Sequence, residues 1–332
     1  MNRSLSGSKY LSRFERIEKL EAGPLKVNGP VVATVNQVSR LSSSTALLNA
    51  FLELVKIRIT FFVGMSAAFG YILAANNVSI NMILPVFGIF LLSCGSAVLN
   101  HYQERTTDSL MHRTNERPLP TGIVSPTTAL VLVFVLAISG GLMVYLTSNF
   151  TALVLSLMAF LWYNAIYTPM KKVTAFAVIP GSFVGALPVM AGWAAAGGSI
   201  LDPRLIAVSV FFFIWQIPHF WLLMDIYSYD YERAGFPTLR KYFGKKTLAV
   251  LTFAWIVILS LTSLLFITTK VVNNIFVDTV IVMLGSWLVV GTHPIILNSG
   301  DKRIDKAAFL KINVYVLAVT LLVMIDKVLN FF

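Results

Sequence analysis

The sequence predicts an all-α protein that crosses a membrane nine times. Of its 332 residues, 57% are hydrophobic and only 12% are charged, with a mean hydropathy of +0.77. A soluble domain is about one quarter charged, so this composition indicates a polytopic membrane protein. Nine apolar segments are long enough to span about 30 Å of hydrocarbon at about 1.5 Å per residue. The basic residues lie almost entirely in alternate connections, as expected for a protein of this class.

Residues 1–50 are polar and rich in serine and charge, and we expect them to form a tail on the cytoplasmic side. Within it, residues 11–21 are a candidate short surface helix. The tail has no apolar core of the signal-peptide type, and its glutamates argue against a mitochondrial transit peptide, which is poor in acids. These features favour a bacterial plasma membrane over an organellar one. The membrane domain is expected to occupy residues 51–332.

The predicted spans follow one another with short polar connections. The third and fourth are separated only by a turn at 147–150. The nine expected ranges are 57–75, 82–100, 125–146, 151–168, 174–196, 204–226, 247–269, 275–296 and 311–331.

The distribution of basic residues predicts the orientation of the chain. With the N-terminus inside, the tail and the connections on its side carry 23 of the 26 Lys and Arg residues. Only Arg204, Lys270 and Lys327 fall on the other side. The N-terminus is therefore expected in the cytoplasm and the C-terminus outside. The net charge of +11 is mostly this topological signal, and it does not indicate a nucleic-acid partner.

The segment Asn100–Gly122 places polar groups where the second span leaves the membrane. Asn100, Glu104 and Asp108 are spaced by four residues, so on a helix they drift only about 40° per step and share one face. Two carboxylates at this spacing repel each other unless a cation lies between them. Arg105 points about 100° away from Glu104 and is poorly aimed to be that cation.

A Mg2+ ion fits between Glu104 and Asp108, because Mg2+ is usually bound through one or two carboxylates plus substrate phosphate oxygens. Arg113 and Arg117 follow, and guanidinium groups match phosphate oxygens. The segment thus predicts a site for a metal ion and a diphosphate. On spacing alone, an equally good interpretation is a solvated loop whose acids and arginines pair with one another.

A second polar stretch follows the sixth span on the same side. His219 and Asp225 lie within or at the edge of the apolar zone, where polar groups are costly and often functional. Asp230, Tyr231 and Glu232 follow in the loop. One or more of these residues is a candidate to bind a second Mg2+ or to orient a diphosphate. The alternative is interfacial anchoring by the neighbouring aromatic residues, with the acids in water.

Four further cations lie on this side, Lys56 and Arg58 at the first span and Lys171 and Lys172 after the fourth. Each alone is a positive-inside anchor, but together they would attract an anionic substrate.

Other features indicate packing rather than chemistry. Cys94 lies in an apolar run and is expected to act as a small buried hydrophobe. Gly181 and Gly185 form a small-xxx-small pair, which is typical of close helix packing. The four histidines lack metal-ligand spacing, so a metalloprotease is unsupported.

The two polar stretches resemble the protohaem IX farnesyltransferase (haem O synthase) family of UbiA-type intramembrane prenyltransferases. The superfamily motif N-x-x-x-D-x-x-x-D is matched by Asn100, Glu104 and Asp108, with Glu at the centre. The continuation from Met111 to Gly122 resembles the family signature M-x-R-T-x-x-R-P-L-P-x-G. The similarity covers about residues 50–330. It includes Lys56, Arg58, Tyr167-Thr168-Pro169, GALPVMAGW (185–193), Pro218–Trp221 and Asp230-Tyr231.

The second motif departs from that of superfamily members acting on hydroxybenzoate-type acceptors. Those proteins have D-x-x-x-D, whereas Tyr227 and Tyr231 take these places here. The haem branch likewise keeps mainly the Asp-Tyr pair. Asp230 is the best remaining candidate for a metal ligand in this loop.

The resemblance implies transfer of farnesyl from farnesyl diphosphate to the 2-vinyl group of haem B, with addition of water, giving haem O and diphosphate. It also implies that the nine helices surround a cavity open to the cytoplasmic side. Mg2+ would be held by Glu104, Asp108 and Asp230, with Asn100 and Tyr231 also in the catalytic set. The expected diphosphate-binding residues are Lys56, Arg58, Arg113, Arg117, Lys171 and Lys172. The expected farnesyl- and haem-binding residues are Tyr102, Tyr163, Tyr167, His219 and Trp221, with His219 as an iron ligand, a propionate donor or a packing residue.

Two other functions remain open. A sister prenyltransferase acting on a quinone-ring or chlorophyll-type acceptor should show a fuller acidic second motif. A transporter should show inverted repeats and charges at mid-bilayer. The partners expected besides farnesyl diphosphate and haem B are the lipid bilayer and a downstream haem A synthase. Asp278 and Asp326, near the opposite face with Lys327, have no functional interpretation.

Overall fold

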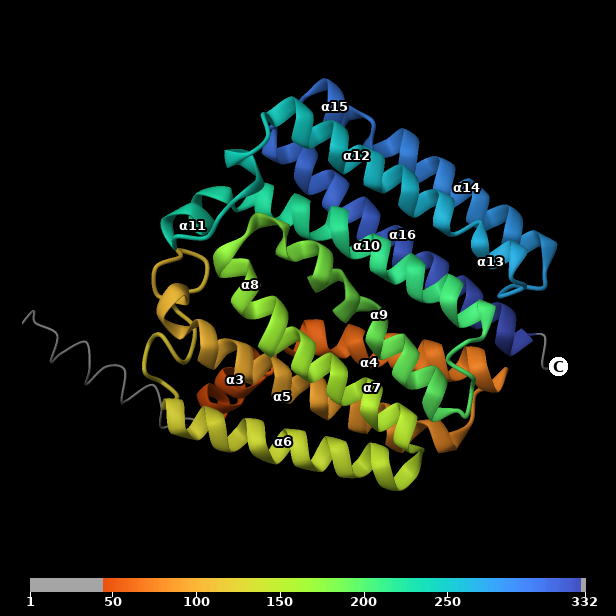
Figure 1. The fold of residues 1–332 in the computed structure, drawn as a ribbon, viewed down its shortest axis with the longest axis horizontal. Helices are drawn as coiled ribbons and strands as arrows, with labels where there is room; N and C mark the ends of the chain where they lie inside the picture. The colour runs from red at the N-terminus through yellow and green to blue at the C-terminus, as the bar shows by residue number, and fades with distance from the viewer. Residues whose placement is uncertain (1–43, 330–332) are drawn as a thin grey trace, which may run out of the picture. The chain divides into compact units, whose positions relative to one another are not determined.

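Helices make up most of the chain that the computed structural model describes, residues 44–329, and no strand occurs within this range (Figure 1). The predicted helix at 11–21 and most of the predicted tail lie outside the described residues. Nine helical segments of the described part are long and apolar enough to cross a membrane, as predicted. Their helices are α4 (Ile57–Ala75), α5 (Ile83–Asp108), α6 (Pro126–Thr147), α7 (Phe150–Leu161), α9 (Val178–Ala195), α10 (Pro203–Ile226), α12 (Lys245–Thr262), α14 (Ile275–Thr292) and α16 (Lys302–Leu329).

Short elements extend or connect these spans. The fourth span continues from α7 through a π-helical turn, η2 (Trp162–Tyr167), into α8 (Thr168–Val173). The remaining short helices are α3 (Ser44–Leu54), η1 (Ile80–Met82), η3 (Ala175–Ala177), α11 (Ser228–Arg233), η4 (Leu239–Lys241), α13 (Leu265–Thr268) and α15 (Pro294–Leu297).

Two spans extend furthest beyond the ranges that their apolar runs predicted. The second continues to Asp108 instead of ending at 100, and the last begins at Lys302 instead of 311. Hydropathy detects only the apolar part of a helix, and both extensions are polar. The extension of α16 is rich in residues that favour helices, such as Lys, Arg, Ala and Leu, whereas that of α5 contains only Gln, Glu and Arg of this kind. The extension of α5 carries the first polar motif on a regular helix.

The turn between the third and fourth spans is as tight as predicted. α6 ends at Thr147 and α7 begins at Phe150. The Asn149 side chain accepts a hydrogen bond from the backbone N–H of Ala152 at 3.0 Å, which caps the new helix.

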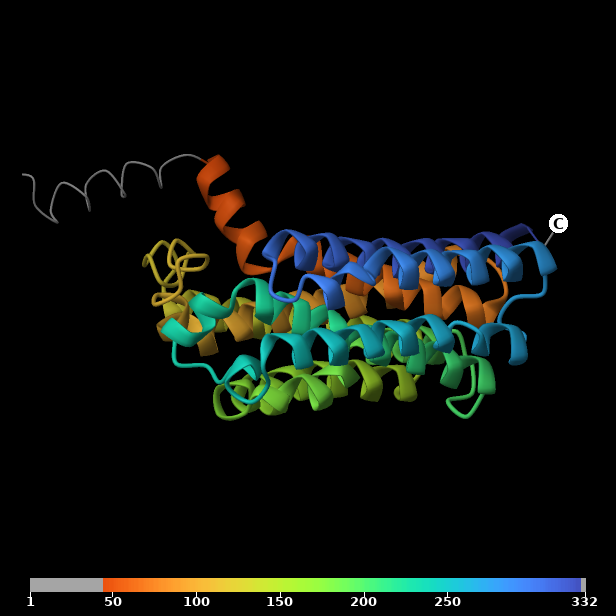
Figure 2. The ribbon, with the colours of Figure 1, turned by 90° about the horizontal axis from the view of Figure 1, so that it is seen from above.

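Small residues allow the spans to approach closely. A Cβ atom at Gly192 of α9 would lie 1.8 Å from the carbonyl oxygen of Ala67 in α4, and one at Gly70 would lie 2.0 Å from that of Val189. At these two positions the backbones of α4 and α9 are so close that only glycine fits between them. Figure 2 shows the spans running side by side in nearly parallel directions.

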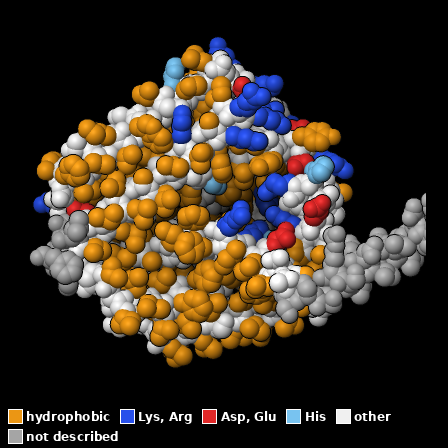
Figure 3. Space-filling model, turned by 180° about the vertical axis from the view of Figure 1, so that it is seen from behind, with side chains coloured by type: hydrophobic (Ala, Val, Ile, Leu, Met, Phe, Trp, Pro, Cys, Tyr) orange, Lys and Arg blue, Asp and Glu red, His pale blue; other side chains and the backbone are white. Residues whose placement is uncertain are grey.

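The surface in Figure 3 is almost wholly apolar apart from one region, where basic side chains gather beside a hollow with acidic ones close by. Large exposed hydrophobic residues such as Phe134 (69%) and Val290 (74%) fit contact with lipid. The polar region lies at the end of the bundle where α4 begins and α5 and α10 end.

Candidate active site

One face of α5 carries the first polar motif into the protein. Leu92, Ser96, Asn100, Glu104 and Asp108 are all buried and follow one another at intervals of four. Asn100, Glu104 and Asp108 are 1%, 4% and 1% exposed. The prediction that these three side chains share one face is confirmed. The alternative interpretation was wrong about solvation, because both carboxylates are buried, but right that an acid pairs with an arginine, because Asp108 pairs with Arg117.

Asn100 is held by both neighbouring spans. The Lys56 ammonium donates to the Asn100 side-chain oxygen at 2.6 Å, and the Asn100 amide donates to the Thr168 hydroxyl at 3.1 Å. The Thr168 hydroxyl donates in turn to the carbonyl of Tyr163 at 2.9 Å. The amide is thereby fixed between α4 and α8.

Each carboxylate has a cation as partner. Lys171 of α8 forms an ion pair with Glu104. The Arg117 guanidinium donates to Oδ2 of Asp108 at 2.8 Å. Buried carboxylates and cations from three parts of the chain thus meet at one point, which suits a polyanionic ligand with its counter-ion.

The segment after α5 is folded so that Arg117 points back to Asp108. The Thr114 hydroxyl donates to the backbone carbonyl of Asp108 at 2.9 Å, and Leu119 is buried. Gly122 adopts φ +75°, a conformation that L side chains rarely adopt. The residues between Met111 and Gly122 therefore form the turn that directs Arg117 toward Asp108.

Lys56 joins α3 to α4 in a left-handed conformation with φ 49° and ψ 51°. A non-glycine residue in this region stores strain of about 1 to 3 kcal/mol, and such residues gather at functional sites. Burial lowers the pKa of Lys56 to about 7, with Arg117 acting in the same direction and Glu104 opposing it. An anion bound beside Lys56 would favour its charged form.

Three of the predicted diphosphate-binding cations lie outside the ion-paired group. Arg58 is exposed and forms no hydrogen bond or ion pair with a described residue. Arg113 is exposed with its guanidinium 4.9 Å from the ring centre of Tyr227, and Lys172 donates to the Gln103 carbonyl at 3.3 Å. These three side chains therefore do not belong to the group of cations that contacts Asn100, Glu104 and Asp108.

Arg105 does not bridge the acids, as predicted. It donates to the backbone carbonyl of Tyr102 at 2.7 Å and lies 4.4 Å above the Tyr102 ring. Tyr102 packs against a cluster that includes Leu54, Cys94 and Val98. Its ring is therefore not part of the aromatic group formed by the other predicted tyrosines. Cys94 is 3% exposed in this cluster, which confirms its packing role.

Aromatic rings continue the site into the bundle. The Tyr163 and Tyr167 rings lie 5.6 Å apart, and Tyr167 lies 5.6 Å from Phe220. The Lys171 ammonium is 5.7 Å from the Tyr167 ring centre. The π-helical turn Trp162–Tyr167 sets both tyrosines, and such turns often occur at functional sites. Aromatic faces of this kind stabilise a neighbouring cation.

The predicted glycine pair makes room for side chains of the site. A Cβ at Gly181 would lie 2.4 Å from the Tyr167 ring, and one at Gly185 would lie 2.5 Å from the side chain of Gln216. Close packing was predicted correctly, and the contact of Gly181 shows that it positions Tyr167.

His219 and Trp221 point in different directions on α10. Nδ1 of His219 lies 2.9 Å from the Asn313 side-chain oxygen, and its ring is 4.7 Å from that of Phe309. Trp221 is buried in another cluster, edge-on to Trp255 at 6.4 Å. His219 thus extends the aromatic row beyond Phe220, whereas Trp221 packs away from it.

The acids of the second stretch have different surroundings. Asp225 is ion-paired with Arg240, and Glu232 accepts a hydrogen bond from the Thr238 hydroxyl at 2.8 Å. Asp230 is partly exposed and forms no hydrogen bond or ion pair with a described residue. Its role as a ligand stays a prediction.

Tyr231 joins this loop to the site. Its ring is 5.7 Å from Phe236, and the Lys171 ammonium is 5.8 Å from the Phe236 ring centre. The first and second polar stretches therefore meet around Lys171.

Sequence reasoning assigned no role to several polar residues here. Thr168 was named only as part of the Tyr167-Thr168-Pro169 match, Asn164 lies just before it, and Gln103 lies inside the first motif. The Asn164 amide donates to Ser96 at 2.7 Å, and Gln103 donates to the Asn164 carbonyl at 3.0 Å. His101 is 1% exposed with neither ring nitrogen hydrogen-bonded. Apart from the match at Thr168, the signal of these residues in the sequence was their polarity within or beside apolar spans.

The donor set fits a hard cation that also binds substrate oxygens. Among the described residues no three His, Cys, Asp or Glu side chains lie together as a complete metal cage. However, Oδ1 of Asp108 is buried and has no hydrogen-bond partner. Two carboxylates, Glu104 and Asp108, match the protein share of a Mg2+ site that is completed by phosphate oxygens and water.

Comparison with known proteins points to the same family that the two polar stretches resemble. The model of the UbiA prenyltransferase family matches residues 60–315. The protoheme IX farnesyltransferase of Oleidesulfovibrio alaskensis is 39% identical over 192 residues, which are 58% of this chain and 68% of that protein. That of Flavobacterium psychrophilum is 29% identical over 305 residues, which are 89% of this chain and 100% of that protein.

Two solved structures have a similar fold. A digeranylgeranylglyceryl phosphate synthase superposes with a TM-score of 0.69 at 17% identity, covering 85% of this chain and 98% of its own. A UbiA homologue from Archaeoglobus fulgidus, bound to GPP and Mg2+, superposes with a TM-score of 0.58 at 15% identity, covering 83% and 99%. At these identities the likeness establishes the nine-helix fold.

Proposed function

The chain belongs to the UbiA prenyltransferase family, and we propose that it transfers the farnesyl group of farnesyl diphosphate to the 2-vinyl group of protohaem IX, giving haem O. The observation that carries the transferase chemistry is the buried pair Glu104 and Asp108 with its ring of cations. The names of the relatives favour haem as acceptor over a quinone-ring or chlorophyll-type acceptor and over transport.

The cations of the site would receive the diphosphate. Lys56, Lys171 and Arg117 are held in place by Asn100, Glu104 and Asp108, and each has further hydrogens to donate. Fixed positive groups of this kind stabilise the charge that develops on a leaving diphosphate. Arg58, Arg113 and Lys172 at the margin would add to the attraction of the anion.

Glu104 and Asp108 are the residues that would hold Mg2+. Asp230 of the second stretch, the third expected ligand, does not lie together with them in the described part of the structure. Bound by Glu104 and Asp108, Mg2+ would neutralise diphosphate charge and weaken the bond to the farnesyl carbon. Oδ1 of Asp108, which has no hydrogen-bond partner among the described residues, supports this assignment.

The aromatic row would accommodate the reacting carbon. When the carbon–oxygen bond of farnesyl diphosphate breaks, its electron pair leaves with the diphosphate, and the allylic cation lies beside Tyr163 and Tyr167. The terminal carbon of the haem vinyl group then bonds to this cation. The positive charge moves to the vinyl carbon next to the ring, where water adds and loses a proton. His219, at the far end of the row, is placed to contact the haem.

We propose that the site faces the cytoplasm. The basic residues of the chain concentrate at this end, which favours a cytoplasmic N-terminus in a bacterial plasma membrane.

The proposed function is tested by incubating the purified protein in detergent with haem B, farnesyl diphosphate and Mg2+, with and without a chelator. Chromatography and mass measurement should show a more hydrophobic haem that has gained a farnesyl group and one water, and the chelator should prevent its formation. Unchanged haem from folded protein would contradict the proposed acceptor. Prenylation of an added aromatic acceptor in the same assay would identify a sister activity.

A further inference from the structure

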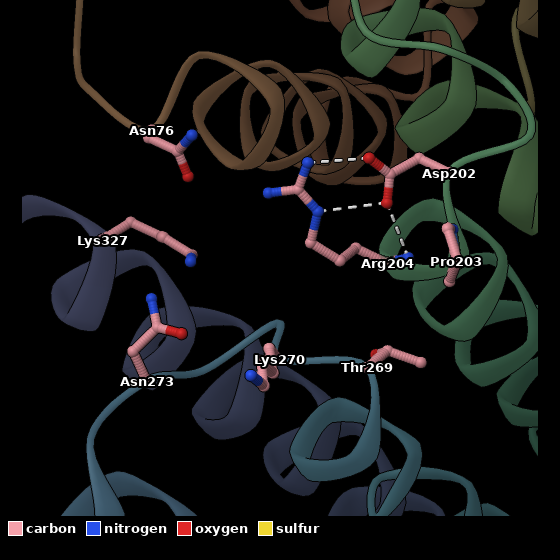
Figure 4. Close-up of a pocket in the computed structure, with 8 residues that line it drawn as sticks. All are labelled: Asn76, Asp202, Pro203, Arg204, Thr269, Lys270, Asn273 and Lys327. Atoms are coloured by element: carbon pink, nitrogen blue, oxygen red, sulfur yellow. Dashed lines mark hydrogen bonds and ion pairs between the residues drawn. The ribbon is translucent and has the colours of Figure 1, made fainter.

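A polar cavity lies at the end of the bundle opposite the candidate active site, where α4 and α16 end and α10 begins (Figure 4). From Lys56 to Asn76, α4 alone covers about 30 Å at about 1.5 Å per residue, so this cavity is separate from the candidate active site. Its volume is about 640 Å³, within the usual range of ligand sites. The lining residues are Asn76, Asp202, Pro203, Arg204, Thr269, Lys270, Asn273 and Lys327.

Positive charge predominates in this cavity. It contains all three of the cations that the sequence places on this side, Arg204, Lys270 and Lys327, but only one acid, Asp202. Arg204 satisfies that acid with hydrogen bonds of 3.0 and 2.7 Å to its two oxygens. The pair lowers the pKa of the Asp202 carboxyl, which therefore stays charged. Both lysines remain uncompensated by any acid that lines the cavity.

Lys327 is the least expected of these cations. The residue is only 5% exposed, and its ammonium forms no hydrogen bond or ion pair with a described residue. Figure 4 shows the ammonium directed into the cavity, facing the side of Arg204. The neighbouring Asp326 does not line the cavity, and its Oδ2 accepts a hydrogen bond from the backbone N–H of Asn273 at 3.3 Å. The Lys327 side chain is buried while its ammonium opens into the cavity, with Asp326 as a nearby charge outside the lining, so an anion in the cavity would add a charge partner that faces the ammonium.

The other lining groups are suited to an anion as well. Lys270 adopts a left-handed conformation with φ 56° at the end of α13, which is unusual for a side chain that bears a Cβ. The amides of Asn76 and Asn273 and the hydroxyl of Thr269 can all donate hydrogen bonds. Arg204 is itself held over the ring of Trp193 at 5.2 Å, so the cavity has one fixed cation and two that are free to pair.

We propose that this cavity binds a phosphate group, with Lys327 and Lys270 as its charged ligands. The source of the phosphate is either a phospholipid headgroup in the adjacent leaflet or a free phosphate in solution. Large apolar side chains border the lining residues in sequence and are exposed: Leu201 (78%), Ile275 (78%) and Phe276 (71%). These exposed apolar side chains favour the lipid, because acyl chains could lie against them while the headgroup occupies the cavity.

The test compares the wild-type chain with Lys327→Met, Lys270→Met and a control, Lys306→Met. Lys306 is an exposed lysine near the start of the same helix, α16, at the opposite end of the bundle. Native mass spectrometry of the delipidated protein would measure binding of phosphatidylglycerol and, in a second arm, of inorganic phosphate. Each lost charged hydrogen bond should weaken binding about tenfold or more.

We expect both Lys327→Met and Lys270→Met to weaken phosphatidylglycerol binding while Lys306→Met leaves it unchanged. If inorganic phosphate is bound with the same dependence on the two lysines, the free anion is the ligand source; if it is not bound, the lipid is. Lys270 is exposed, so its variant should fold even if Lys327→Met does not. Equal binding of both ligands by Lys270→Met and Lys306→Met would overturn the proposal.

Farnesyl transfer provides a separate readout. Because the cavity lies away from Lys56 and Asp108, Lys270→Met should retain the transfer rate of the wild-type chain. The result on phosphate binding is therefore independent of the outcome of the haem assay.

Discussion

Lys171 of α8 forms an ion pair with Glu104 of α5, although the two residues belong to different spans. Glu104 is 4% exposed, and the Lys171 side chain is 20% exposed. The pair joins the first polar motif to the turn that carries Tyr167, because Lys171 also lies over the Tyr167 ring. Lys171 therefore fixes the charged group around Glu104 and the ring of Tyr167 relative to each other.

Lys171→Met should destabilise the protein by about 1 to 3 kcal/mol, because it leaves Glu104 buried without its cation. If Glu104 also binds Mg2+, adding Mg2+ should restore part of the lost stability in the variant and change the wild-type chain less. Thermal unfolding in detergent, with and without Mg2+, measures both effects. The exposed neighbour provides the control, Lys172→Met. A variant whose stability is unaffected by Mg2+ would argue against Glu104 as a ligand.

Asp108→Asn should lower farnesyl transfer by about 100-fold or more, because it removes charge from the proposed metal ligand and from the partner of Arg117. Asn has nearly the same shape, so the folded state should persist, as circular dichroism can verify. The control is Asp278→Asn, which changes a carboxylate near the other end of the bundle and should retain activity. Near-normal turnover by Asp108→Asn at saturating Mg2+ would show that the metal assignment is wrong.

Local periodicity accounts for the part of the site that was predictable. The spacing of Asn100, Glu104 and Asp108 determines their common face on any helix, and apolar length determines the spans. The ion pair between Lys171 and Glu104 was not predictable in this way, because it depends on how the fourth span packs against the second. The same holds for the contact of His219 with Asn313 of α16.

The cavity lined by Arg204, Lys270 and Lys327 was not predictable from composition either. Arg204, Lys270 and Lys327 are far apart in sequence and appear there only as exceptions to the positive-inside pattern. They meet because α10, α13 and α16 place them at the same end of the bundle. The first turns of α16, residues 302–310, were not predicted as part of the span. They contain charged residues, and hydropathy alone detects this helix only from 311 onward.

Gly181→Ala should reduce farnesyl transfer while leaving the fold intact. The added Cβ would lie 2.4 Å from the Tyr167 ring, which must move to accommodate it. Gly141→Ala is a matched control in α6, where the nearest atom to the new Cβ is 3.8 Å away and Ala favours the helix. Steady-state kinetics should show a lower kcat for Gly181→Ala and no loss for Gly141→Ala. Equal activity of the two variants would mean that the exact place of the Tyr167 ring is unimportant.

The titration of Lys56 should make binding of farnesyl diphosphate weaken as the pH rises above about 7. Burial lowers the pKa of Lys56 to about 7 in the protein without substrate, so the ammonium is mostly charged at pH 6 and mostly neutral at pH 8. The diphosphate binds the charged form better, and its binding should therefore be accompanied by proton uptake near neutral pH.

The same shift predicts a stability effect of opposite direction. From about pH 7 up to the pKa of an ordinary lysine, the folded chain without substrate binds fewer protons at Lys56 than the unfolded chain, so its stability should rise with pH.

The binding prediction is tested with Lys56→Arg, which keeps its charge throughout this range. The variant should therefore lose the extra dependence of KM on pH between about 7 and 9, with the substrate's own ionisation cancelling in the comparison. If KM varies with pH identically in both chains, Lys56 is not the titrating group.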